Sequence, residues 1–228
     1  MGEFLFEKLS DPEYYEENRE AAHSDHVAYR NWDEADVWLD PLGRKSSFRL
    51  FLDGSWKFHS AKNYEQTIRG FEKPEYDCRG WDDIRVPAHI QMEGYDSPQY
   101  ANTQYPWDGR EDVWTDEMPT KFNPVASYVK YFTLPESFSG ERVFISFQGA
   151  ESGMALWLNG TYVGYSEDSF TPSEFELTPY LKDGENKLAV QVQGKALFHR
   201  ALEAVPAEQF DRTVVVSQYP EVLELAHR

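Results

Sequence analysis

Short runs of alternating apolar residues, separated by turn residues, constrain the fold of this chain more than any other feature. The segments 127–135, 141–152 and 187–194 each place apolar side chains at nearly every second position. A period of two is typical of a strand with one buried face. Almost no stretch shows the 3.6-residue period of an amphipathic helix. The pattern predicts an all-β chain folded as an antiparallel β-sandwich or jelly roll.

Two turn dipeptides sharpen this prediction. Asn159-Gly160 and Asp53-Gly54 each lie between apolar runs. Asn-Gly and Asp-Gly favour the left-handed backbone that two-residue hairpin turns need. We therefore expect one hairpin at each dipeptide.

The two ends of the chain have a different character. Residues 1–47 are acidic and weakly patterned, and Asp11-Pro12 favours one or two helical turns after it. Residues 194–228 begin with an Ala- and Leu-rich stretch that favours a helix. We expect an extended arm (1–47) that packs on something else, a jelly roll (48–193) and a divergent tail (194–228).

Composition excludes several classes of partner. The formal net charge of -18 disfavours binding to nucleic acid and to anionic membranes. No run approaches the ~20 apolar residues of a membrane span, and the first residues lack the features of a signal peptide. The single cysteine, Cys78, allows no internal disulfide and is interpreted as a passive thiol. These features predict a cytoplasmic protein.

No catalytic constellation is recognisable. The chain has no phosphate-binding glycine motif and no G-x-S-x-G elbow. Glu167-Asp168 and Asp82-Asp83 are adjacent acidic pairs, but neighbours on a strand point to opposite faces, so neither predicts a catalytic dyad. The two histidines of segment 23–26 are too few for a metal site. We expect no catalytic and no metal-binding residue in this chain.

One loop, residues 95–107 ("YDSPQYANTQYPW"), has the chemistry of a sugar site. Its aromatic rings suit the apolar faces of a sugar, and its amide side chains suit the hydroxyls. The alternative is that these aromatics pack on the core.

Longer motifs point to a family. In order along the chain they are "RNWDEADV", "LDGSWKF", "VPAHIQMEGYDSPQYANTQYPW", "NPVASYVKYFTLP" and "ISFQGAESGMALWLNGTYVGYSEDSFTPSEFELTPYLKDGENKLAVQV". Together they cover about residues 28–193 and closely resemble the N-terminal domain of family 2 β-galactosidases of the lacZ type. The resemblance implies a jelly roll of the galactose-binding-domain type.

The resemblance also implies a division of labour. In the family, both catalytic glutamates lie in a (β/α)8 barrel, and the full enzyme uses Mg and Na. The jelly roll supplies an asparagine of a Y-x-N-x-x-Y-P motif to the galactoside pocket, which corresponds to Asn102 here. We therefore expect Asn102 to bind substrate, no cofactor in this chain, and no activity of the chain on its own.

The resemblance ends near Gly194. The family continues with an acidic segment whose aspartate helps to bind galactose and sodium. Asp211 lies in a vaguely similar place but lacks the flanking residues, so the role is not transferred to it. Either a frameshift near codon 194 or a tail that docks on a partner would explain the departure; coding DNA without the missing segment in another frame excludes the frameshift.

Three functions remain open. The first is a part of a β-galactosidase. Its partners would be a galactoside and either a catalytic barrel supplied in trans or further copies of the same chain. The second is a free-standing carbohydrate-binding module that uses Trp107, Trp114 and Tyr165. The third is a non-catalytic assembly scaffold. Jelly rolls serve many roles, so the fold alone does not choose among them.

Overall fold

The computed structural model describes most of the chain: residues 4–11, 13–24, 26–35, 43–97, 108–114 and 119–193. Within these ranges the structure contains nine β-strands and four short 3-10 helices, and it contains no α-helix. All strand pairs are antiparallel. The predicted all-β sandwich is confirmed.

The elements follow one another along the chain with their bounds as follows. The strands are β1 (Glu16–Glu17), β2 (Gly54–Ala61), β3 (Asp82–Val86), β4 (Val125–Thr133), β5 (Phe144–Phe147), β6 (Gly153–Leu158), β7 (Thr161–Ser166), β8 (Ser173–Glu176) and β9 (Glu185–Gln193). The 3-10 helices are η1 (Phe6–Ser10), η2 (Tyr64–Gln66), η3 (Glu136–Phe138) and η4 (Thr178–Tyr180).

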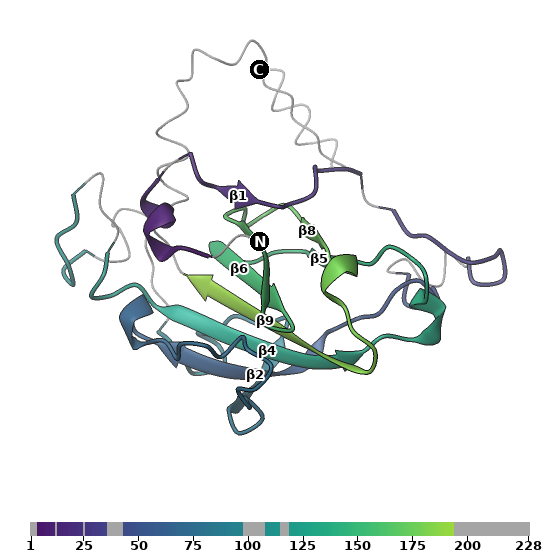
Figure 1. Cartoon of the computed structure of the whole chain (residues 1–228). Coiled ribbons are helices and arrows are strands. Elements are labelled where there is room, and N and C mark those ends of the chain that lie inside the picture. The colour runs from purple at the N-terminus through teal and green to yellow at the C-terminus, as the bar shows by residue number, and fades with distance from the viewer. Residues whose placement is uncertain are drawn as a thin grey trace, which may run out of the picture.

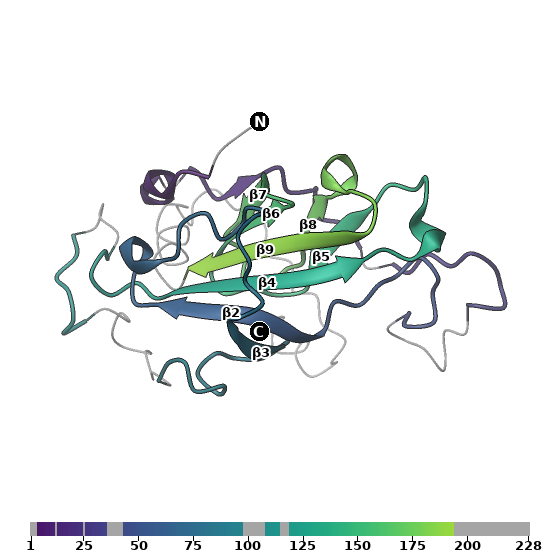
Figure 2. The same cartoon turned by 60° about the horizontal axis from the view of Figure 1, so that its bottom comes forward.

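The strands form one large and one small sheet (Figures 1 and 2). The large sheet has the order β1-β7-β6-β9-β4-β2-β3, and the small sheet pairs β5 with β8. The long strands β4 and β9 pair along their whole length, from Val125 opposite Gln193 to Thr133 opposite Glu185. They lie at the centre of the large sheet, so the features at their ends belong to a firmly held frame.

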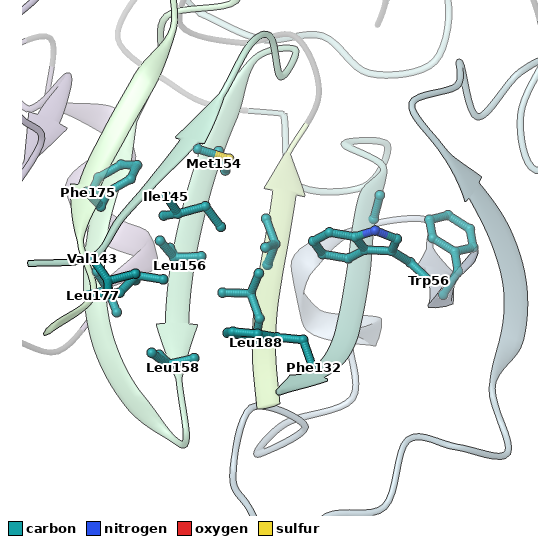
Figure 3. Packing of buried hydrophobic residues seen from close by; sticks show 14 of the residues in the cluster. Trp56, Phe132, Val143, Ile145, Met154, Leu156, Leu158, Phe175, Leu177 and Leu188 are labelled. Atoms are coloured by element: carbon teal, nitrogen blue, oxygen red, sulfur yellow. The ribbon is translucent and has the colours of Figure 1, made fainter. Parts of the chain in front are cut away.

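The main hydrophobic core lies between the two sheets. Alternate residues of β6 point into it, and Figure 3 shows Met154, Leu156 and Leu158 following one another along that strand. Phe175 of β8, a fully buried side chain, contributes from the small sheet. This core explains the alternation seen in the sequence, because every second side chain of these strands leaves water.

The opposite face of the large sheet is also covered. Phe4, just before η1, and Leu9, within it, pack against Tyr162 and Tyr165 of β7. The segment 62–81 covers the neighbouring area. The central strands of the large sheet are therefore covered on both faces, and the N-terminal arm packs on the sheet of its own chain.

The arm then joins the edges of both sheets. β1 pairs with β7, and the Glu20 amide donates a hydrogen bond to the Glu174 carbonyl oxygen of β8. Asn18, between them, has a left-handed φ of 56°, and its Nδ2 donates to the Val163 carbonyl oxygen. The helical turns expected after Asp11 are therefore wrong: residues 16–17 form a strand because β7 offers them an unpaired edge.

The two predicted hairpins had different outcomes. Asn159 and Gly160 have φ values of 52° and 83° and join β6 to β7, as predicted. The hairpin at Asp53-Gly54 is wrong, because β2 begins at Gly54 and residues 48–53 form no strand. Instead, the Leu52 carbonyl oxygen accepts a hydrogen bond from Trp56 Nε1 at 2.7 Å.

A buried ammonium group fastens the covering segment to β9. Lys187 is 4% exposed, and its Nζ donates to the carbonyl oxygens of Phe71, Lys73 and Tyr76 at 2.7, 2.8 and 2.5 Å. All three N–H donors are thereby used. The Cys78 thiol lies in the same layer, where burial raises its pKa, in agreement with its interpretation as a passive thiol.

Candidate functional site

Only the first three residues of the predicted sugar loop, 95–97, belong to the described residues, and Tyr95 packs against Phe58 of the main core. Asn102, Trp107 and the rest of residues 98–107 lie outside the described residues, as does the tail 194–228 with Asp211. The described residues nevertheless define the frame beside them. β9 ends at Gln193, directly before the tail, and β4 begins at Val125. The candidate site lies at the end of the large sheet where these two strands meet.

Gln193 holds an unusual position at this end. Its backbone pairs with Val125 on one side and with Gly153 on the other. Its side chain points to the face away from the small sheet, because it alternates with Val190 and Val192, which face the main core. A glutamine therefore occupies the buried outer face of a central strand.

Amide groups at this end lack hydrogen-bond partners among the residues that the structure describes. Gln193 is 5% exposed, and within those residues neither its Nε2 nor its Oε1 has a partner. Asn123, 3% exposed and two residues before β4, likewise leaves its Oδ1 without a partner in the described part of the chain. In contrast, the neighbouring Gln191 donates from Nε2 to Ser127 Oγ at 3.4 Å. Buried polar groups in proteins are normally paired, so these amides require a specific explanation.

A carboxyl group and a phenol lie beside these amides. Tyr165 O–H donates to Glu167 Oε1 at 2.8 Å. A Cβ built on Gly153, the partner of Gln193, would lie 2.7 Å from the Tyr165 hydroxyl, so this hydroxyl sits directly over Gly153. Burial raises the pKa of Glu167 to about 7. The end of the sheet thus combines amide groups that lack partners among the described residues with a carboxyl group that ionises near pH 7.

A second carboxylate belongs to the arm. Glu17 Oε2 accepts hydrogen bonds from the hydroxyls of Tyr14 and Tyr162 at 2.6 and 3.2 Å. Burial, followed by the hydrogen bond to Glu17, raises the pKa of Tyr14 to about 12. Both phenols therefore stay protonated at neutral pH, and they serve as hydrogen-bond donors that fix the arm.

The acidic pairs of the sequence form no dyad. Asp82 and Asp83 are neighbours on β3, as expected. Glu167 and Asp168 follow the end of β7 and are not part of a strand, so that part of the reasoning was wrong. They still have different surroundings, because Asp168 pairs with Arg19 at 3.3 Å and accepts hydrogen bonds from the Thr171 backbone amide and hydroxyl.

The aromatic residues assigned to a free-standing module are only partly suited to it. Trp114 is 76% exposed, as a sugar platform requires. Tyr165 is 1% exposed and packs beneath Phe4 and Tyr14, so its prediction as a sugar-contacting surface residue is wrong. Tyr165 instead holds Glu167.

Metal binding finds no support in the described part of the chain. His23 Nε2 lies 2.6 Å from Glu174 Oε2, an ion pair whenever the imidazole is protonated. Within the described ranges, no three His, Cys, Asp or Glu side chains gather in a way that could hold a metal ion. These ranges also contain no helix long and apolar enough to cross a membrane.

Sequence reasoning missed Gln193 and Asn123. A signal existed: in the run 185–193, Gln191 and Gln193 alternate with Val190 and Val192. Such a pattern ordinarily predicts polar residues facing water. Only the folded structure shows that these glutamines are buried.

Comparison with known proteins gives the family. Residues 50–204 match the sugar binding domain of the glycosyl hydrolases of family 2. A β-galactosidase of Halalkalibacterium halodurans is 52% identical over 184 residues, which are 81% of this chain and 18% of that protein. A β-galactosidase large subunit of Leuconostoc lactis is 43% identical over 81% of this chain and 30% of its own length. The chain thus spans less than a third of each of these relatives.

A solved structure gives a more distant likeness. The match to a glycosyl hydrolase family 2 member from Bacteroides cellulosilyticus covers 64% of this chain and 18% of that protein's chain. The TM-score is 0.46 and the sequence identity is 23%. The family match alone covers more than half of the present chain. The chain therefore belongs to the glycosyl hydrolases of family 2, whose sugar-binding domain it contains.

Proposed function

We propose that this chain is the sugar-binding part of a β-galactosidase. In this role it contributes to galactoside binding and to the architecture of the active site, while the catalytic glutamates belong to a barrel supplied in trans. The observation that carries the proposal is the 52% identity to a β-galactosidase over 81% of the chain. The relatives named as large subunits support a partner, because such names imply a second subunit in those proteins.

Asn102 is the proposed contact to the galactoside. A carboxamide both donates and accepts hydrogen bonds, which suits a sugar hydroxyl. One such bond contributes about 0.5–1.5 kcal/mol net. Asn102 therefore adjusts affinity and is not its only source. The cytoplasmic location belongs to the same proposal and rests on the sequence features described above.

The test is a hydrolysis assay with a chromogenic galactoside. The pure chain is assayed alone and with a barrel-containing fragment of a related β-galactosidase that lacks its first domain. We expect activity only in the mixture. Activity of the chain alone, or silence of the mixture, contradicts the proposal.

Variants of the loop test the role of Asn102. In the mixture, Asn102→Ala should raise the KM for the galactoside by roughly three- to tenfold, as expected for one lost hydrogen bond. Thr103→Ala in the same loop is the matched control and should leave the KM within about twofold. Equal effects of both variants would show that the loop acts only as a whole.

A free-standing carbohydrate-binding module is the second candidate. The exposed Trp114 favours it, since exposed aromatic rings serve sugar faces. Galactose binding by the chain alone that is lost in Trp114→Ala, together with a silent mixture in the hydrolysis assay, would identify the module. The scaffold alternative predicts neither binding nor hydrolysis.

A further inference from the structure

The inference starts from the cost of the unpaired amides. Among the residues that the structure describes, neither polar side-chain atom of the buried Gln193 has a partner, and the same is true of Oδ1 of the buried Asn123. Leaving buried donors and acceptors unpaired destabilises a fold, whereas an apolar side chain of similar shape does not. The fold alone therefore gives no reason for a glutamine at the end of β9.

The neighbouring glutamine shows what a structural role looks like. Gln191 lies on the same face of the same strand and is 4% exposed, yet it donates to Ser127. The next row of the sheet, where Gln193 lies between Val125 and Gly153, offers no such partner. The difference between the two glutamines is therefore one of pairing and not of burial.

The position of the orphan amides indicates what pairs with them. Gln193 is the last residue of β9, and Asn123 precedes the first residue of β4, with the register placing Val125 opposite Gln193. Residues two apart across a pair of strands are within reach of long side chains. The two residues therefore lie near the same end of the large sheet, one at the end of β9 and the other just before β4.

We propose that Gln193 and Asn123 bind hydroxyl groups of the sugar ligand. The inference rests on the proposed function and extends it to residues beyond Asn102. A carboxamide presents one acceptor and a pair of donors, which fits two neighbouring hydroxyls, because each hydroxyl both donates and accepts. Asn123 Oδ1 accepts from a further hydroxyl. The Tyr165 hydroxyl, which donates to Glu167, lies over Gly153 in the strand next to Gln193.

The proposal predicts that removing the amide of Gln193 stabilises the fold and weakens sugar binding. Gln193→Met keeps the length of the side chain and removes both orphan atoms. We expect it to raise the midpoint of thermal unfolding by roughly 2–4 °C. The same change should weaken galactose binding about tenfold, equivalent to 1.4 kcal/mol. A residue held for stability alone would change neither quantity in this direction.

Titration calorimetry with galactose and lactose, combined with thermal unfolding, tests this on the full chain. Gln191→Met is the matched control, and it should keep the affinity and give no rise in the midpoint. Asn123→Leu is a second test variant in case Gln193→Met does not fold, and the same two changes are expected of it. Weaker binding in the test variants but not in the control supports the proposal.

Three results would overturn it. Unchanged affinity in Gln193→Met or Asn123→Leu refutes the sugar contact while leaving the proposed function intact. An equal loss in Gln191→Met shows a general disturbance of β9. No binding of either sugar by the unaltered chain, with a silent mixture in the hydrolysis assay, removes the proposed function and the inference with it; no binding but an active mixture removes the inference alone.

Discussion

At the scale of single residues, Glu167 is a carboxyl group whose surroundings favour its protonated form. It is held by Tyr165 at 2.8 Å, and burial raises its pKa to about 7. Its backbone amide also donates to the Tyr15 carbonyl oxygen of the arm at 3.1 Å. Glu17, Tyr14 and Lys8 are the charged and titratable arm groups nearby. Ionisation of Glu167 therefore acts where the arm meets the sheet.

Glu167 gives the stability of the protein a defined dependence on pH. Below about pH 4.5 the carboxyl group is protonated in both the folded and the unfolded state, so it does not change the free energy of unfolding. Between pH 4.5 and 7 only the folded state keeps the proton, so the free energy of unfolding falls as pH rises, by at most about 3 kcal/mol. Glu167→Gln should therefore stabilise the protein at pH 8 and not at pH 4.5.

Urea unfolding at the two pH values measures this difference. The exposed Glu75→Gln is the control, and its effect should be small at both. A gain from Glu167→Gln that is the same at pH 4.5 and pH 8 would mean that burial does not hold the proton on Glu167.

At the scale of elements, local chemistry predicted some parts and tertiary pairing decided others. The turn at Asn159-Gly160 was predictable because its left-handed backbone depends on two residues alone. The strand at residues 16–17 was not, because its partner in β7 lies about 150 residues later. The same holds for the site: the motif around Asn102 is local, whereas the neighbours of Gln193 in the sheet, Val125 and Gly153, are set by tertiary pairing.

The close approach of β1 to β7 requires a glycine. A Cβ at position 164 would lie 2.5 Å from the Glu17 carbonyl oxygen and 2.7 Å from the Phe175 ring. Gly164→Ala should lower the free energy of unfolding by about 1–3 kcal/mol, as overpacking does. It should also loosen the arm, because Glu17 and Phe175 cannot both keep their places.

Hydrogen exchange followed by mass spectrometry reports on the two effects separately. We expect Gly164→Ala to speed up exchange more in a peptide covering residues 13–20 than in a peptide covering β9. Gly80→Ala is the control, since a Cβ there would meet no atom within 4 Å. An arm as protected in Gly164→Ala as in the unaltered chain would show that the sheet adapts around the new methyl group.

At the scale of the whole molecule, charge is the dominant property. The net charge of -18 makes the folded chain repel itself, and the repulsion is screened by salt. Raising NaCl from 10 mM to 0.3 M should increase the midpoint of thermal unfolding by roughly 3 °C, or about 1 kcal/mol. A midpoint that falls with added salt would show that ion pairs such as Arg142–Glu176 outweigh the repulsion.

The Lys187 ammonium has a consequence for the order of events during synthesis. Its acceptors on Phe71, Lys73 and Tyr76 precede it by 111 to 116 residues. At about 5–20 residues per second, a ribosome needs on the order of ten seconds to make that interval. During that time β9 has not been synthesised, so the nascent segment 62–81 cannot pack against it. Its apolar residues, Phe71 and Trp81 among them, are then open to chaperones, and the cover closes only when the last central strand emerges.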